Sequence, residues 1–248
     1  MKKRILSFAL VLCLLMQTLC VITSATDLSP TPVYSQTELD AKDFLVRLGA
    51  LDENIDLNGV ATKSSFLCMV LKATKTTIVD AEQQYFTDVP ATYYAANEIA
   101  TGYNVGYIRG NGNGTFSPDK IIGSNEALSI VMNALNYGYM AGSSEYYNVI
   151  KNQNILKNIE VNADGTLDNG ACIVLLKNML MAEYNMLSGV IGDAGIYTRD
   201  GETTLLYIHY SISYSTELVT AVGGNHLEDY TKAVDGYIRL KDVLVEDK

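Results

Sequence analysis

Between positions 85 and 136, hydrophobic residues recur at three- and four-residue intervals in two separate stretches. Residues with this spacing share one face of an α-helix, so each stretch predicts an amphipathic helix with one buried side. We expect the first buried face to comprise Tyr94, Ala95, Glu98 and Ile99, and the second to comprise Ala127, Leu128, Val131, Met132 and Leu135.

A glycine-rich loop separates these two helices. Gly110, Gly112 and Gly114 supply positions at which the backbone can adopt the positive φ angles of a tight loop. Phe116 follows them, and we expect it to anchor the loop in the core. Pro118 has no backbone N–H, which prevents the segment from continuing as a central strand.

Two further segments repeat the order of helix, turn and second helix. Upstream, Ala41–Gly49 and Phe66–Ala73 predict a pair of helices. Downstream, Tyr146–Leu156 and Ala171–Tyr184 predict another pair, joined by a turn at 162–165. Because a repeated unit determines the whole architecture, the sequence predicts a mainly α-helical bundle of three repeats.

The pattern changes after residue 184. Thr204–Tyr214 alternates apolar and polar residues, as a half-buried strand does, and Asp200-Gly201 before it is a hairpin turn signal. Glu217–Val222 and Gly236–Val245 indicate further strands. We therefore expect a small β domain over 187–248, which makes the predicted fold class α+β.

The N-terminus has the pattern of a signal peptide. Three cations, Lys2, Lys3 and Arg4, precede the largely apolar stretch Ile5–Ile22, and small residues up to Ala25 offer a cleavage point. We expect cleavage after Ala25, so that 1–25 is removed; the alternative is an uncleaved membrane anchor. Cleavage would change the formal charge from −10 to 15 − 28 = −13.

Composition argues against several classes of function. The 28 acidic against 18 basic residues disfavour nucleic acid or anionic lipid as a partner, because both require a basic surface. No catalytic motif is present, so we expect neither an enzyme nor a cofactor. The stretch 162–168 has oxygen ligands at alternating positions but lacks the closing glutamate of a calcium loop, so we expect no metal site.

Two cysteines, Cys68 and Cys172, would remain after cleavage, each within an apolar helical stretch. Buried thiols acting as small hydrophobic residues are one interpretation, and a disulfide between them is the other. His209 and His226 are expected to be surface or packing residues.

The segment Tyr85–Asn136, with its Phe-x-Asp-Val-Pro turn and its Gly-Thr-Phe-Ser-Pro-Asp loop, resembles an S-layer homology repeat. That resemblance implies a three-fold bundle that attaches an exported bacterial protein non-covalently to cell-wall polysaccharide. The repeats would span 36–81, 82–140 and 141–185. The weaker outer copies follow the same order of elements as the middle one.

The resemblance also implies site residues. The family's second helix begins with a Thr-Arg-Ala-Glu motif, whose arginine would contact the acidic glycan as a two-pronged donor. The matching positions here are Thr62-Lys63-Ser64-Ser65, Gly123-Ser124-Asn125-Glu126 and Asp168-Asn169-Gly170-Ala171. The glycan-binding candidates are therefore Asp88, Tyr94, Lys63 and Glu126, with Arg109 as a replacement cation.

Two interpretations of these residues stay open at this point. In the functional one they form a glycan groove, and the chain is an exported cell-surface protein bound to wall polysaccharide. In the structural one, Asp88 is a helix N-cap, Tyr94 a core aromatic and Lys63 a solvated charge. The chain would then be a secreted structural or protein-interaction module that keeps the fold and has lost glycan binding.

Overall fold

The computed structural model describes residues 34–81, 83–191, 194–200 and 203–212. The predicted signal peptide, the strands predicted at Glu217–Val222 and Gly236–Val245, and His226 lie outside these residues. Within them, no helix is both long and apolar enough to cross a bilayer.

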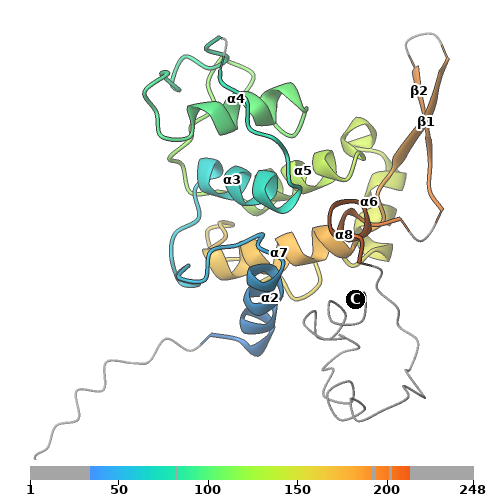
Figure 1. The fold of residues 1–248 in the computed structure, drawn as a ribbon, viewed down its shortest axis with the longest axis horizontal. Helices are drawn as coiled ribbons and strands as arrows, with labels where there is room; N and C mark the ends of the chain where they lie inside the picture. Colours follow the sequence, from blue (N-terminus) through green and yellow to red (C-terminus); the bar gives the residue numbers. More distant parts are fainter. Residues whose placement is uncertain (1–33, 82, 192–193, 201–202, 213–248) are drawn as a thin grey trace, which may run out of the picture. The chain divides into compact units, whose positions relative to one another are not determined.

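The fold is mixed α+β and mainly helical (Figure 1). The helices are α2 (Gln36–Arg47), α3 (Lys63–Ala73), α4 (Ala96–Asn104), α5 (Ser124–Ala134), α6 (Ser144–Asn152), α7 (Asn169–Met181) and α8 (Leu205–Tyr210), with a 3₁₀ turn η1 (Gly138–Met140). The strands β1 (Met186–Ile191) and β2 (Ala194–Thr198) form an antiparallel hairpin. Helices α3, α5 and α7 pack against one another, α4 covers α3, and α2 and α8 pack on α7.

Side chains that precede the helices cap their first turns. The hydroxyls of Ser35 and Thr62 and the carboxylate of Asp168 accept hydrogen bonds from the third residue of α2, α3 and α7 respectively. Gly123 has no side chain, so the Glu126 carboxylate instead reaches back to the Gly123 N–H at 3.2 Å. Each bond satisfies a backbone group that the helix itself leaves open.

The three segments that lead into α3, α5 and α7 pair with one another in a ring. The residues immediately before these helices are Thr62, Gly123 and Asp168. Each forms a backbone bridge with a residue two positions before another of the three: Thr62 with Ile121, Gly123 with Thr166, and Asp168 with Val60. The spacings are 123 − 121, 168 − 166 and 62 − 60, so all three are 2. The pairing is therefore cyclic and the three segments occupy equivalent places.

Hydrogen bonds and burial follow the same cycle. The first N–H of each helix donates to the neighbouring segment, from Lys63 to Lys120, from Ser124 to Gly165 and from Asn169 to Gly59, at 2.9 to 3.0 Å. Ala61, Ile122 and Leu167, which precede the three cap residues, are all buried. This arrangement supports the three-repeat interpretation, whose residue boundaries stay a prediction.

Two loops have the same internal hydrogen bonds. In 111–115 the Asn111 N–H and side-chain amide bond the Thr115 carbonyl and hydroxyl, and in 162–166 Asn162 does the same with Thr166. Asn113 and Asp164 each accept from the following threonine. The two loops thus share one local conformation, held by the same pattern of side-chain hydrogen bonds.

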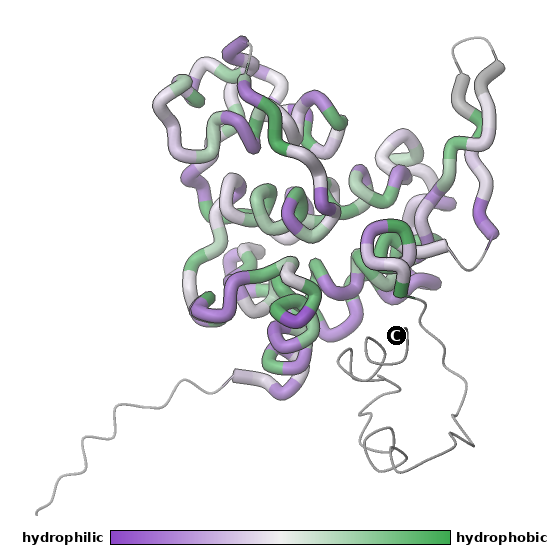
Figure 2. Tube along the Cα trace, viewed as in Figure 1, coloured by the Kyte–Doolittle hydropathy of each residue, from purple (hydrophilic) through white to green (hydrophobic). Residues whose placement is uncertain are grey.

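The hydrophobic pattern predicted most of the core correctly. Figure 2 shows apolar residues along α3, where Phe66, Leu67, Val70 and Leu71 are buried. On α5, the expected stripe of Ala127, Val131, Met132 and Leu135 is buried and Leu128 is half-buried.

The first predicted face in this repeat was partly wrong. Ala95 and Ile99 are buried as expected. Glu98 is only half-buried, and Tyr94 lies outside α4 with 70% of its surface exposed. Helical periodicity does not apply to Tyr94, because the helix begins two residues later at Ala96.

Cys68 and Cys172 are free thiols, so the disulfide between them is not formed. Cys172 is buried and Cys68 is half-buried, which agrees with the interpretation of both as small hydrophobic packing residues. Burial raises the pKa of the Cys68 thiol to about 11 and also raises the pKa of Cys172. A thiol reacts through its thiolate, so both are poorly reactive near neutral pH.

The predicted strand Thr204–Tyr214 is wrong, because Leu205–Tyr210 forms helix α8. The Thr204 hydroxyl accepts a hydrogen bond from the Tyr207 N–H and caps the first turn. Leu205 and Leu206, which are adjacent, are both buried, whereas Ile208 is 43% exposed. Packing on α7 therefore overrides the alternation. Gly201 of the predicted turn and the last two residues of the predicted strand, 213–214, lie outside the described residues.

We expect replacement of Gly110 by alanine to destabilise the fold by about 3 kcal/mol. Gly110 has a φ of +75°, and an added Cβ would collide with the Phe86 ring and lie 2.8 Å from the Thr115 carbonyl oxygen. Gly112 has a similar φ of +82° but open space around it, so Gly112→Ala should cost only about 1 kcal/mol. Urea denaturation of both variants measures the difference, and equal costs would contradict the packing argument.

Candidate functional site

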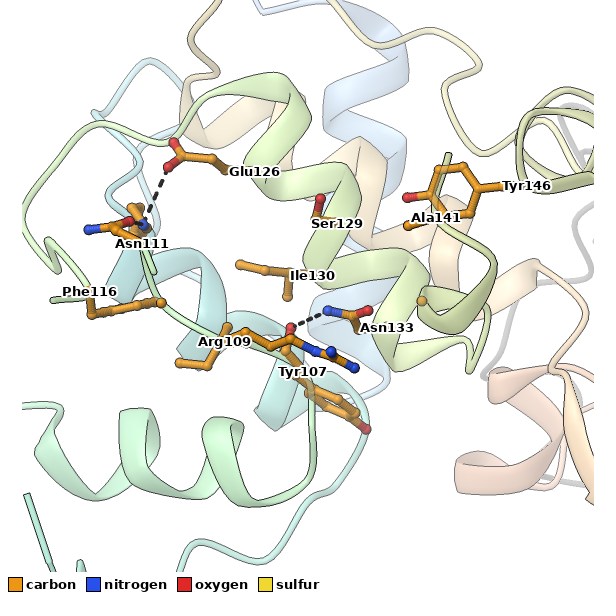
Figure 3. A pocket seen from close by; sticks show the side chains of 14 residues that line it. Tyr107, Arg109, Asn111, Phe116, Glu126, Ser129, Ile130, Asn133, Ala141 and Tyr146 are labelled. Carbon is orange, nitrogen blue, oxygen red and sulfur yellow. Dashed lines mark hydrogen bonds and ion pairs between the residues drawn. The ribbon is translucent and has the colours of Figure 1, made fainter. Parts of the chain in front are cut away.

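A cavity of about 380 Å³ opens between the loop after α4, helix α5 and η1 (Figure 3). Its lining combines two cationic side chains, a carboxylate, amides and aromatic rings. The residues that matter for its chemistry are Lys63, Arg109, Glu126, Asn133, Phe116 and Tyr146. Three of the five predicted site residues therefore meet at one cavity.

Lys63 is almost completely buried in the wall of this cavity, with 5% of its surface exposed. Its Nζ donates to Asn111 Oδ1 at 2.9 Å and pairs with Glu126 Oε1 at 3.3 Å. The same Nζ lies 4.8 Å from the centre of the Phe116 ring, in the geometry of a cation–π contact. The charge of Lys63 is thus balanced inside the protein, and the expected solvated lysine is wrong.

Glu126 links the start of α5 to two lysines. Its carboxylate pairs with Lys63 and, at 3.1 Å, with Lys120, and it accepts from the Gly123 N–H. Burial alone would raise the pKa of Glu126, but the Gly123 N–H, Lys120 and Lys63 outweigh it and lower the pKa. Glu126 is therefore ionised near neutral pH and is already committed to protein partners.

Arg109 is the exposed cation at this cavity. Within the part of the chain that the structure describes, its guanidinium makes no ion pair and no hydrogen bond. Figure 3 shows it beside Asn133 and Tyr107, where the Asn133 amide donates to the Tyr107 carbonyl at 2.9 Å. A free guanidinium next to amide and hydroxyl groups is suited to binding an anionic polar ligand.

Asp88 ties the turn before α4 to the glycine-rich loop. Its two carboxylate oxygens accept from the N–H groups of Phe116 and Ser117 at 2.8 and 2.7 Å. The expectation that Asp88 is a helix N-cap is wrong, because α4 starts only after Ala95. Burial opposes ionisation, but the two N–H groups and the charge of Lys63 lower the pKa of Asp88.

Tyr94 lies apart from the cavity lining. Its hydroxyl is 2.9 Å from the buried Ser64 hydroxyl, and its ring centre is 4.7 Å from that of Tyr93. Tyr93 in turn donates to Asp119 at 2.7 Å. With 70% of its surface exposed, Tyr94 is not the core aromatic that the structural interpretation expected.

Some lining residues were missed at the sequence level. The recurring pattern Asn-x-x-x-Thr in 111–115 and 162–166 could have identified Asn111 as a loop residue, since both copies share it. Asn133 and Tyr146 carry no comparable signal. Tyr146 lies on α6 and reaches the cavity only through tertiary packing.

Other candidate chemistry is weak in the described residues. No group of three metal-ligating side chains occurs in 34–81, 83–191, 194–200 or 203–212. His209 lies on α8, where burial, followed by the charge of Lys75, lowers its pKa.

Residues 85–122 match the sequence profile of the S-layer homology domain. They include the Asp88 turn, α4 and the loop that carries Arg109 and Asn111. The chain contains an S-layer homology domain.

A curated relative of the chain is named "Cell surface protein" and comes from Thermoanaerobacter kivui. It is 24% identical over an alignment that covers 62% of this chain. The alignment spans 26% of the relative, so the chain corresponds to about a quarter of that protein's length.

Asp88→Asn should lower the free energy of unfolding at neutral pH. It should also reduce the amount by which that free energy falls when the pH is lowered. The unfolded chain has an ordinary aspartate pKa of about 3.9, and the folded value is lower. Between these values the unfolded state binds more protons, so the stabilisation is complete above the unfolded pKa and disappears as pH falls through the folded pKa. Urea midpoints at pH 7 and pH 3 measure this, and an unchanged acid response would contradict it.

Lys63→Met should destabilise the fold by about 2 kcal/mol, because the partly buried Glu126 carboxylate loses its buried partner. The double variant with Lys63→Met and Glu126→Gln should be about 1 kcal/mol more stable than the sum of the two single destabilisations predicts. The control is Lys72→Met, whose pair with Asp52 is exposed and should contribute less than about 0.5 kcal/mol. Additive effects in the double variant would argue against the internal pair.

Proposed function

We propose that the chain is a non-enzymatic cell-surface protein that associates non-covalently with cell-wall polysaccharide. The support is the S-layer homology match over 85–122 and the likeness to a protein named "Cell surface protein". Export through the predicted signal peptide 1–25 would deliver it to the wall.

The observation that carries the proposed binding site is the exposed guanidinium of Arg109 at the 380 Å³ cavity, which has no ion-pair partner among the described residues. Lys63 holds the position of the family's motif arginine, but its charge is used by Glu126 and Asn111. Arg109 then takes over the cationic contact to an acidic group of the glycan.

The remaining lining suits the rest of a sugar. Ser129, Asn133 and Tyr146 offer hydroxyl and amide groups, and sugar hydroxyls both donate and accept hydrogen bonds. The volume falls in the range of small-molecule sites, about 300–1,000 Å³. In this proposal Lys63, Glu126 and Asp88 hold the cavity in shape, while Arg109 contacts the ligand.

A second function has an observation in its favour. The inward Lys63 and the formal charge of −10 both disfavour an acidic ligand. On that account the chain is a secreted structural or protein-interaction module that keeps the fold without binding glycan. Binding to purified walls distinguishes the two functions.

We expect the purified chain to sediment with cell walls from Thermoanaerobacter kivui that retain their polysaccharide, and Arg109→Ala to raise the dissociation constant about tenfold. The matched control is Arg47→Ala, which removes the same charge from α2, where Arg47 pairs with the exposed Asp43. Arg47→Ala should leave binding unchanged.

The binding isotherm, with thermal unfolding of each variant as the check on folding, decides between the outcomes. A wild-type chain that stays in the supernatant would support the structural module. Equal losses of wall affinity for Arg109→Ala and Arg47→Ala would show that binding depends on the net charge of the chain and not on the cavity.

A further inference from the structure

A pair of tyrosines joins the hairpin to the helical part of the fold. Tyr139 on η1 and Tyr197 on β2 stack with ring centres 4.4 Å apart and planes inclined by 14°. Tyr139 remains 56% exposed despite this contact. An exposed ring that is held in one place can stack on the apolar face of a ligand.

The buried side-chain amide of Asn185 holds Tyr139 in position. The Asn185 side-chain amide donates to the Tyr139 hydroxyl at 3.2 Å and to the Asn136 carbonyl at 3.0 Å. The Asn136 amide donates back to the Asn185 carbonyl at 2.8 Å. Asn185 is 3% exposed, so this reciprocal pair is protected from water. The ring is therefore ordered before any ligand arrives, which reduces the entropic cost of binding.

The tyrosine pair lies next to the Arg109 cavity. Gly138, the first residue of η1, and Ala141, which follows η1, both line that cavity. Arg199, two residues after Tyr197, pairs with Glu145 at 2.9 Å, and Glu183 also lies near enough to act on its charge. The tyrosine pair thus adds an aromatic surface beside the cavity.

We propose that Tyr139, supported by Tyr197, is a second subsite that stacks on an uncharged sugar ring of the polysaccharide whose acidic group Arg109 binds. This inference rests on the function proposed above. The apolar C–H face of a pyranose fits an aromatic ring, and its hydroxyls stay in water. Arg109 fixes the charged unit and Tyr139 fixes a neighbouring neutral unit of the same chain.

The two contacts differ in their response to salt. An ion pair between exposed groups weakens as salt screens it, whereas stacking of neutral groups does not. Tyr139→Ala should therefore weaken binding to Thermoanaerobacter kivui walls about fivefold at both 50 mM and 500 mM NaCl, as roughly expected for one aromatic contact. The loss caused by Arg109→Ala should be large at 50 mM and small at 500 mM.

Two further variants keep this test decisive. Tyr139→Phe retains the ring and loses only the bond from Asn185, so it should bind within about twofold of the wild type. Tyr207→Ala removes an equally exposed tyrosine from α8 and should have no effect. If Tyr139→Phe loses as much wall affinity as Tyr139→Ala, the effect comes from the anchoring of the hairpin, and the proposed subsite is wrong.

If Arg109→Ala weakens binding and Tyr139→Ala does not, the cavity stands and the tyrosine subsite is wrong. If the wild-type chain binds no wall material, both proposals are overturned. A Tyr139→Ala loss that disappears at 500 mM NaCl would also contradict stacking on a neutral sugar.

Discussion

The cyclic pairing of the three segments that precede α3, α5 and α7 is the constraint on which the rest of the structure depends. These bridges bring three helix N-termini together and enclose the small apolar group Ala61, Ile122 and Leu167. Each segment satisfies backbone groups of its neighbour, so no segment is complete alone. A loop that leads into one of these helices then lies against the start of a neighbouring helix, as the loop 111–115 does with α3.

That packing explains why the cation at the family's motif position is directed inward. Lys63 is the first residue of α3, and the cyclic pairing places it against the next segment, where Asn111 and Phe116 of the loop and Glu126 of α5 surround it. In the third segment the corresponding residue, Asn169, donates to the Asp56 carbonyl of the neighbouring loop. These first-turn residues therefore hold segments together, and in the function proposed above a loop residue, Arg109, contacts the ligand instead.

The sequence allowed the helices and most of the core to be predicted, because periodicity reports burial where packing is regular. Periodicity did not predict three kinds of feature. Tyr94 precedes its helix, so periodicity misplaced it in the core. Thr204 caps a helix whose alternating sequence indicated a strand. The burial of Lys63 and the contribution of Tyr146 arise between segments distant in sequence, where spacing carries no information.

Hydrogen exchange tests most directly whether the glycan binds at the Arg109 cavity. The purified chain would be measured with and without soluble polysaccharide fragments released from Thermoanaerobacter kivui walls. The account predicts slower exchange at 107–111, 129–133 and 138–141, with no change at 93–94. Protection confined to 93–94 and the start of α3 would place the ligand at the family's motif positions and contradict the account, as would fragments that protect no amide.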